Sequence, residues 1–123
     1  MAEGTTVLSH DVETRDSRLR EALLAAIEER HTDPHCDVAR LSRELFVSRR
    51  QLYRLADGGV AALLTRRRIA TAEALLLSEP DLSIEEVAAM SGFTSSSRLR
   101  AQLHRTTGKT PTGYRLAAAS LGG

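Results

Sequence analysis

Three side chains in the segment RRQLYRL are of the types that read nucleic-acid bases. Arg50, Tyr53 and Arg54 are spaced i, i+3 and i+4, which places them on one face of a helix. Leu52 and Leu55 fall on the opposite face. An arginine can donate two hydrogen bonds to N7 and O6 of guanine, and a tyrosine ring can pack on a sugar or a thymine methyl. This face predicts base contact in a major groove; the alternative is a solvated basic face.

A second set of candidates lies in the segment SSSRLRAQLHR, aligned with the first through the leucines of both segments. Ser97 and Arg98 then face the bases, while Ser96 and Arg100 lie near the groove walls. Ala101 falls on the same face, and its short side chain removes a long hydrogen-bond donor. The second helix therefore either reads bases through Ser97 and Arg98 or mainly contacts the DNA backbone.

Phosphate contacts are expected from helix starts and from further arginines. The free N–H groups at a helix start attract anions, and Ser48 and Thr94 stand where the two reading helices are expected to begin. Arg49, Arg67 and Arg68 supply cations that position a duplex without specifying its sequence. For either of the last two, the alternative is an ordinary solvated helix face.

The cluster HTDPHC brings three metal-ligating side chains together. His31, His35 and Cys36 are soft ligands, but Pro34 breaks the helical spacing and a fourth ligand is not apparent. We therefore predict a loop between helices and no metal site. No nucleophile–base arrangement, phosphate loop or carboxylate pair stands out, which predicts a protein without catalytic residues or cofactor.

Length and composition limit the class of protein. A chain of 123 residues is enough for one domain with a real core. No apolar run approaches the roughly 18 residues of a membrane span, and the start MAEGTTVLSHDVE lacks a signal-peptide pattern. The single cysteine agrees with a reducing compartment. We expect a cytoplasmic protein without membrane contact.

The overall charge of +1 conceals an asymmetry along the chain. Residues 1–37 hold nine Asp and Glu against four Arg, a net charge of −5. Residues 38–123 hold seven Asp and Glu against thirteen Lys and Arg, a net charge of +6. A basic segment of this size indicates a polyanionic partner for the second part.

The apolar spacing predicts seven helices and no strand, an all-α fold. Residues 1–15 show no sustained period, and we expect a flexible tail there. Ser83 with Glu86 is a capping box, the best-specified helix start in the chain. Helices are expected from Asp16 or Ser17 to about His31, from Asp37, from Ser48 to before Asp57, from Val60 to Leu77, from Ser83, from Thr94 to about Thr106 with a stop at Gly108, and from Pro111.

Two copies of a helix-turn-helix pattern are present, and the second is the clearer. In it Ala88 is small enough for close helix crossing, Gly92 permits a left-handed turn, and Phe93 fills the corner. The first copy lies 46 residues upstream. It keeps a small residue at Ser42 but has Phe46 where the turn glycine would stand.

These segments resemble the DNA-binding domain of the AraC/XylS family of bacterial transcription regulators, over about residues 17–116. The resemblance rests on SIEEVAAMSGF, GKTPTGYR, VSRRQLYRL and RRIATAEALL. It implies two helix-turn-helix subdomains joined by a long linker helix, a homeodomain-like arrangement with both recognition helices entering successive major grooves, about 34 Å apart. The expected helix over residues 60–77 would be about 27 Å long, which fits that linker.

The resemblance also implies roles and partners. Arg50, Tyr53 and Arg54 match the family's base-facing positions, and Arg68 matches a family arginine. The partners implied are double-stranded DNA and RNA polymerase, with activation through polymerase contact. With two readers in one chain, a monomer is expected to suffice for a non-palindromic site.

We expect a flexible tail at 1–15, a first subdomain at 16–58, a linker helix at 59–78, a second subdomain at 79–119 and a tail at 120–123. The function expected is sequence-specific binding of duplex DNA in transcription regulation. The alternative is a protein-interaction module that docks on RNA polymerase or another regulator and binds DNA only weakly or nonspecifically. Met1 and the N-terminal tail favour a stand-alone regulator over a fragment.

Overall fold

The computed structural model describes the backbone of residues 2–56 and 59–122, and the side chains of residues 14–56 and 59–119. Seven helices and no strand occur in these ranges, which confirms the expected all-α fold. No helix among them is long and apolar enough to cross a membrane. The helices are α1 (Ala2–Arg30), α2 (Val38–Leu45), α3 (Arg49–Leu55), α4 (Val60–Ser78), α5 (Ile84–Met90), α6 (Ser96–Thr107) and α7 (Pro111–Gly122).

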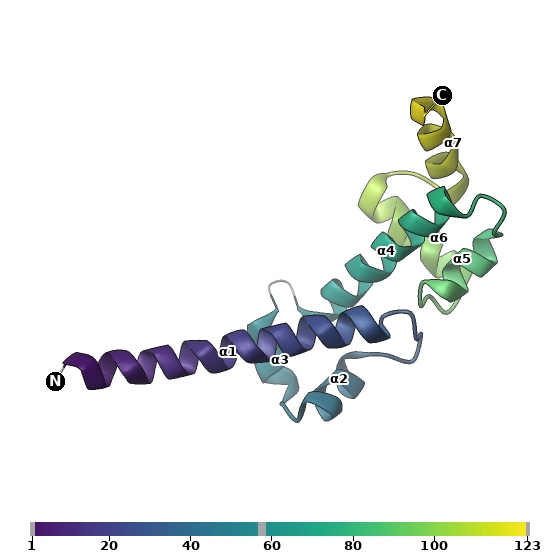
Figure 1. The fold of residues 1–123 in the computed structure, drawn as a ribbon. Coiled ribbons are helices and arrows are strands. Elements are labelled where there is room, and N and C mark those ends of the chain that lie inside the picture. Colours follow the sequence, from purple (N-terminus) through teal and green to yellow (C-terminus); the bar gives the residue numbers. More distant parts are fainter. Residues whose placement is uncertain (1, 57–58, 123) are drawn as a thin grey trace.

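Two separate hydrophobic cores organise the helices. The first core packs α1, α2, α3 and the start of α4 together, and the second packs the rest of α4 with α5, α6 and α7 (Figure 1). Buried residues of the first core are Leu23, Ile27, Cys36, Leu41, Leu52, Leu55, Ala56, Val60 and Leu64. Those of the second are Ile69, Ala72, Leu76, Val87, Ala88, Phe93, Leu99 and Leu103. Helix α4 is the linker that runs through both.

Most expected helix boundaries are confirmed by the hydrogen bonds at the caps. The Asp37 carboxylate accepts from the N–H of Arg40, at 2.8 Å, and starts α2. The Ser83 hydroxyl accepts from the N–H of Glu86, at 3.0 Å, and starts α5. Gly108 ends α6 in a left-handed conformation with φ of 75°. The side chains of Asp37 and Ser83 thus satisfy N–H groups that a helix start leaves unpaired.

The start of α6 differs by one residue from the expectation. The expected cap was Thr94, but the hydroxyl of Ser95 accepts from the N–H of Arg98, at 3.2 Å, and Ser95 is the N-cap. Thr94 remains exposed in the turn before it. The segment TSSS offers four hydroxyl side chains in a row, and any of them can cap a helix, so the pattern alone did not fix the register.

Residues 2–15 and 120–122, which were expected to be tails, lie in helices. Helix α1 begins at Ala2 and continues through Asp16 and Ser17, and no proline interrupts residues 2–30. Its N-terminal half projects away from the other helices (Figure 1). Helix α7 continues to Gly122 and so includes residues 120–122, where a C-terminal tail was expected. The end of α3 before Asp57 is confirmed at Leu55, while Asp57 itself lies outside the described residues.

Both helix-turn-helix corners use a left-handed residue. Gly92 has φ of 91°, the left-handed turn that a glycine at this position predicted, and Phe93 is buried in the corner beside it. In the first unit Phe46 adopts φ of 56°, with its side chain 94% exposed. A residue with a Cβ is disfavoured in this conformation, so the first corner is the more strained of the two.

Helix α7 is fastened to α4 by the motif TPTGYR. The Thr110 hydroxyl accepts from the N–H of Gly113 at 3.0 Å, and Pro111 is buried. The Tyr114 hydroxyl donates to the Glu73 carboxylate at 2.8 Å, which raises the pKa of Tyr114. Arg115 donates to the backbone carbonyls of Leu76 and Glu79, at the end of α4. The motif therefore closes the second core.

Candidate nucleic-acid interface

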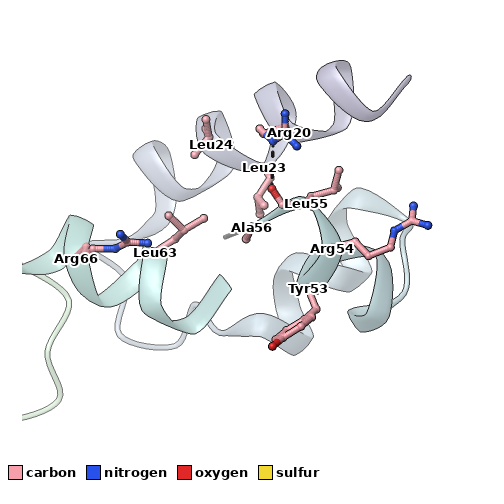
Figure 2. A pocket seen from close by; sticks show the side chains of 9 residues that line it. All are labelled: Arg20, Leu23, Leu24, Tyr53, Arg54, Leu55, Ala56, Leu63 and Arg66. Carbon is pink, nitrogen blue, oxygen red and sulfur yellow. Dashed lines mark hydrogen bonds between the residues drawn. The ribbon is translucent and has the colours of Figure 1, made fainter. Parts of the chain in front are cut away.

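The first reading helix, α3, has one packed and one exposed face. Leu52 and Leu55 are buried in the first core. Arg50, Tyr53 and Arg54 are exposed on the other side, and Tyr53 is 73% exposed. Figure 2 shows Tyr53 and Arg54 projecting from α3 in different directions, away from Leu55. The structure therefore brings the three expected base-facing residues together on an accessible surface.

The start of α3 is closed by a capping box. The Ser48 hydroxyl accepts from the N–H of Gln51, and the Gln51 side chain accepts from the N–H of Ser48, both at 3.1 Å. These two N–H groups are occupied, so Ser48 offers less to an anion than its position in the sequence predicts. Arg49, the next residue, is exposed and keeps its candidate position beside the reading face.

The second reading helix, α6, repeats the arrangement. Leu99 and Leu103 are fully buried in the second core. The outward residues are Ser97, Arg98, Arg100 and Ala101, all exposed, with Ser96 partly exposed at the helix start. The alignment of the two helices through their leucines is thus consistent with the burial pattern. The exposed Ala101 leaves the α6 face with fewer long donors than the α3 face.

An open cleft of about 280 Å³ lies between α4 and the start of α6. Its lining includes the guanidinium-bearing Arg98 and the hydroxyl-bearing residues Thr65 and Thr94. Cationic and hydroxyl groups of this kind suit an anionic group such as a phosphate. Thr94 and Arg98 both line this cleft, even though Thr94 does not cap the helix.

A second, larger hollow of about 730 Å³ lies between α1, α3 and α4 (Figure 2). Its floor is apolar, with Leu23, Leu24 and Leu63. Arg20 lines it and donates from Nε to the carbonyl of Leu55 at 3.1 Å, which ties α1 to the end of α3. The hydrogen bond from Arg20 therefore helps α1 to fix the position of the reading helix α3.

Arg67 is engaged within the protein. Its guanidinium pairs with both carboxylate oxygens of Glu28 on α1, and its Nη1 donates to the Thr71 hydroxyl at 3.2 Å. This pair lowers the pKa of Glu28 and raises that of Arg67. The ion pair joins α1 to α4, and the expected phosphate contact of Arg67 stays a prediction.

Arg68 is also engaged within the protein. Its Nε donates to the carbonyl of His31 at 2.7 Å, and its Nη2 donates to those of Asp33 at 3.0 Å and Cys36 at 2.8 Å. Burial lowers the pKa of the guanidinium. The side chain still stays charged, because an arginine is not deprotonated in proteins. Nε and Nη2 of Arg68 are therefore held by the α1–α2 loop, while Arg68 also lines the cleft beside the start of α6. Its phosphate contact stays a prediction.

The helical spacing of residues in α4 already indicates that Arg68 faces inward, although it stands in a run of three arginines. Arg68 lies four residues after Leu64 and four before Ala72, on the stripe that continues to Leu76. A residue at that spacing faces the same side of the helix as its buried neighbours. The periodicity of α4 places Arg68 inward.

The family of the chain follows from comparison with known proteins. A family model described as a helix-turn-helix domain, of the AraC type, matches residues 41–117. The chain belongs to the AraC family. The matched region runs from the middle of α2 into α7, and so includes both reading helices.

Solved structures of AraC-family domains share this fold. The DNA-binding domain of AdpA, a global transcriptional factor solved in complex with a target DNA, is 30% identical, with a TM-score of 0.75 over 82% of this chain and 93% of that one. The C-terminal domain of the response regulator yesN from Fusobacterium nucleatum is 26% identical, with a TM-score of 0.72 over 77% and 95%.

The C-terminal domain of AraT, a response regulator from Geobacillus stearothermophilus, is 23% identical and has a TM-score of 0.76 over 80% of this chain and 84% of that one, which shows the shared fold. No curated protein sequence matches the chain. The family and the fold together make this chain a DNA-binding transcription regulator. This family is not one of enzymes.

The HTDPHC segment has a structural task in this AraC-family domain. His31 is buried, with Nδ1 at 2.9 Å from the carbonyls of Ile27 and Glu28, at the end of α1. Cys36 is buried in the first core, and burial raises the pKa of its thiol. Across the residues with described side chains, no group of three His, Cys, Asp or Glu could hold a metal ion.

Proposed function

We propose that the chain binds duplex DNA in a sequence-specific manner, with α3 and α6 in successive major grooves. The observation that carries this proposal is the shared design of the two helices, since each buries two leucines and exposes an arginine-bearing face opposite them. An exposed face with guanidinium donors is the geometry of a recognition helix. The similar AdpA domain was solved with its own target DNA, which supports the same use here.

The two helices divide the work unequally in this proposal. On α3, Arg50, Tyr53 and Arg54 contact bases, and Arg49 with the Ser48 start holds the backbone. Three long side chains on one exposed face can specify several base pairs. The α3 half of the site is therefore the more strongly specified half.

On α6, Ser97 and Arg98 contact bases, while Thr94, Ser96 and Arg100 hold phosphates. Thr94 and Arg98 share the lining of the cleft beside α4, which suits a phosphate of the strand that passes between the two grooves. The exposed face of α6 has a methyl group at Ala101 where a long donor would specify a base. In this half of the site, α6 therefore contacts the DNA backbone more than it specifies the base sequence.

We further propose that the domain acts as a monomer in the bacterial cytoplasm, at the nucleoid, and activates transcription through contact with RNA polymerase. Two reading helices in one chain remove the need for a dimer at a non-palindromic site. The proposed units are the first subdomain up to residue 58, the linker at 59–78 and the second subdomain at 79–119. The separation of the hydrophobic cores along α4 supports this division.

Selection of bound sites from a pool of random duplex DNA tests the proposal. We expect one motif with two half-sites about one helical turn apart, and stronger base preference in the half under α3. Recovery of no motif, together with capture of RNA polymerase by the same protein, would instead support the interaction module.

Arg54→Ala tests the role of one reading residue. Loss of a guanidinium that binds one guanine is expected to cost about 1–3 kcal/mol and to relax the preference at a single position of the motif. Affinity for each single-base variant of the recovered site measures this. Weakening by the same factor across all sequences would reassign Arg54 to phosphate.

A further inference from the structure

The two hydrophobic cores meet α4 at different places and leave a gap between them. Leu64 is the last buried residue of the first core on α4, and Ile69 is the first of the second core. No described residue belongs to both cores. Hydrophobic packing therefore holds each half together, but the angle between the halves depends on α4 and on what lies across the gap.

Arg68 crosses the gap from α4 to the loop between α1 and α2. Its guanidinium binds three carbonyls of that loop, those of His31, Asp33 and Cys36, at 2.7 to 3.0 Å. A planar guanidinium with several donors fixes the loop in two directions, which a single hydrogen bond does not. The loop of the first half is thereby locked to the centre of the linker.

The turn of the second half presses against the same loop. A Cβ on Gly92 would lie 1.9 Å from the carbonyl oxygen of His31 and 2.8 Å from Nε of Arg68. Only a residue without a side chain allows this approach. The corner between α5 and α6 therefore rests directly on the end of α1 and on Arg68, and it is a contact between the two halves.

His31 is itself anchored to the linker. Its Nε2 lies 2.6 Å from the hydroxyl of Thr71, one turn along α4 from Arg68. The carbonyl and the ring of His31 are thus held from different sides, by Arg68 and Thr71 respectively. We call His31, Arg68, Thr71 and Gly92 the seam.

We propose that the seam sets the distance and rotation between the two reading helices, so that Arg68 and Gly92 are positioning residues for DNA binding. This inference rests on the proposed function, because it assumes that α3 and α6 occupy two half-sites. Inserting one base pair moves a half-site by about 3.4 Å and rotates it by about 35°. A seam in direct atomic contact does not yield by such an amount, so the seam determines which half-site spacing is bound.

Affinity for sites of different spacing tests the positioning role. The recovered site is compared with versions that carry one base pair more or fewer between the half-sites. Wild-type protein is expected to lose about tenfold or more in affinity for either change. Arg68→Ala is expected to bind the best site more weakly and to lose only about threefold on the same changes.

Arg115→Ala is the matched control. Arg115 donates from Nε to the carbonyl of Leu76 and from Nη2 to that of Glu79, both at 3.0 Å, and so clamps backbone within the second half alone. It is expected to lower stability yet to keep the steep spacing profile. Thr71→Val, which keeps nearly the same shape but removes the hydroxyl that His31 Nε2 and Arg67 Nη1 both contact, keeps the test usable if Arg68→Ala does not fold. An unchanged profile in the folded seam variants would overturn the inference.

A measurement without DNA separates this inference from the proposed function. Spin labels on Arg43→Cys and Arg105→Cys, both exposed and in different halves, report the distance between the halves. The wild-type distribution is expected to be narrow, and Arg68→Ala should at least double its width while Arg115→Ala should not. Narrow distributions in all variants would refute the seam even if DNA binding is specific. Broadening in the seam variants would support it even if no motif were recovered, in which case only the proposed two-site reading fails.

Discussion

The salt dependence of DNA binding depends on how many phosphates the protein neutralises. The structure shows which arginines near the reading faces are exposed and can do so. Five arginines on or beside the reading faces have exposed side chains, Arg49, Arg50, Arg54, Arg98 and Arg100. On a random duplex, where the reading faces recognise no specific base, each of the five can neutralise one phosphate, and log K then falls against log salt with a slope of about −4.5. Raising the salt from about 50 to about 200 mM then weakens binding about 500-fold.

The engaged arginines of the linker change this number if they are counted. Were Arg67 and Arg68 also to hold phosphates, the slope would be about −6.3 and the same change of salt would weaken binding about 6,000-fold. Their contacts with Glu28 and with the loop carbonyls argue for the smaller value. The two slopes differ enough for a titration to separate them.

Fluorescence anisotropy of a labelled random duplex over a salt series measures the slope. Arg49→Ala is expected to reduce its magnitude by about 0.9, because one neutralised phosphate is lost. Arg67→Ala is expected to leave it nearly unchanged, because that guanidinium is paired within the protein. A flat salt dependence of the wild-type protein would refute the phosphate-binding surface, and an equal loss in both variants would refute the division among the arginines.

Two further predictions concern stability. Phe46→Gly is expected to stabilise the fold by up to about 1.5 kcal/mol, because it relieves about 1–2 kcal/mol of left-handed strain and costs roughly 0.5–1 kcal/mol of extra chain entropy. A lower melting temperature would contradict it. Tyr114→Phe is expected to cost about 1 kcal/mol through loss of the bond to Glu73. That bond raises the pKa of Tyr114. The difference in denaturant midpoint between wild type and variant should therefore be complete below about pH 10 and disappear as the pH rises through the raised pKa. A difference that persists at high pH would show that the bond is not its source.

The parts of the fold that sequence could predict are those with a local cause. Asp37 and Gly108 act on the helix ends beside them, and a short window contains all the information. The same holds for the buried and exposed faces of α3 and α6, since helical spacing separates leucines from arginines. The expected set of base-facing residues follows from that spacing and from the resemblance, and its contacts with DNA remain a prediction.

The parts that sequence did not predict have partners far along the chain. Arg67 pairs with Glu28, and Arg68 binds carbonyls more than 30 residues earlier, so an arginine run that looks solvated is engaged. Thr94 and Ser95 differ in position by one residue and in capping ability hardly at all, so the choice depends on packing of the turn. The approach of Gly92 to His31 has no local signature beyond the glycine.

The exposed faces of α3 and α6 have a consequence for how such a domain can change over time. Residues such as Tyr53 and Arg98 contribute little to either core, and substitutions at exposed positions usually alter stability by less than about 0.5 kcal/mol. New target preferences can therefore arise by single replacements on these faces without endangering folding. A gene duplicate of this domain could acquire a different set of promoters while its scaffold stays the same.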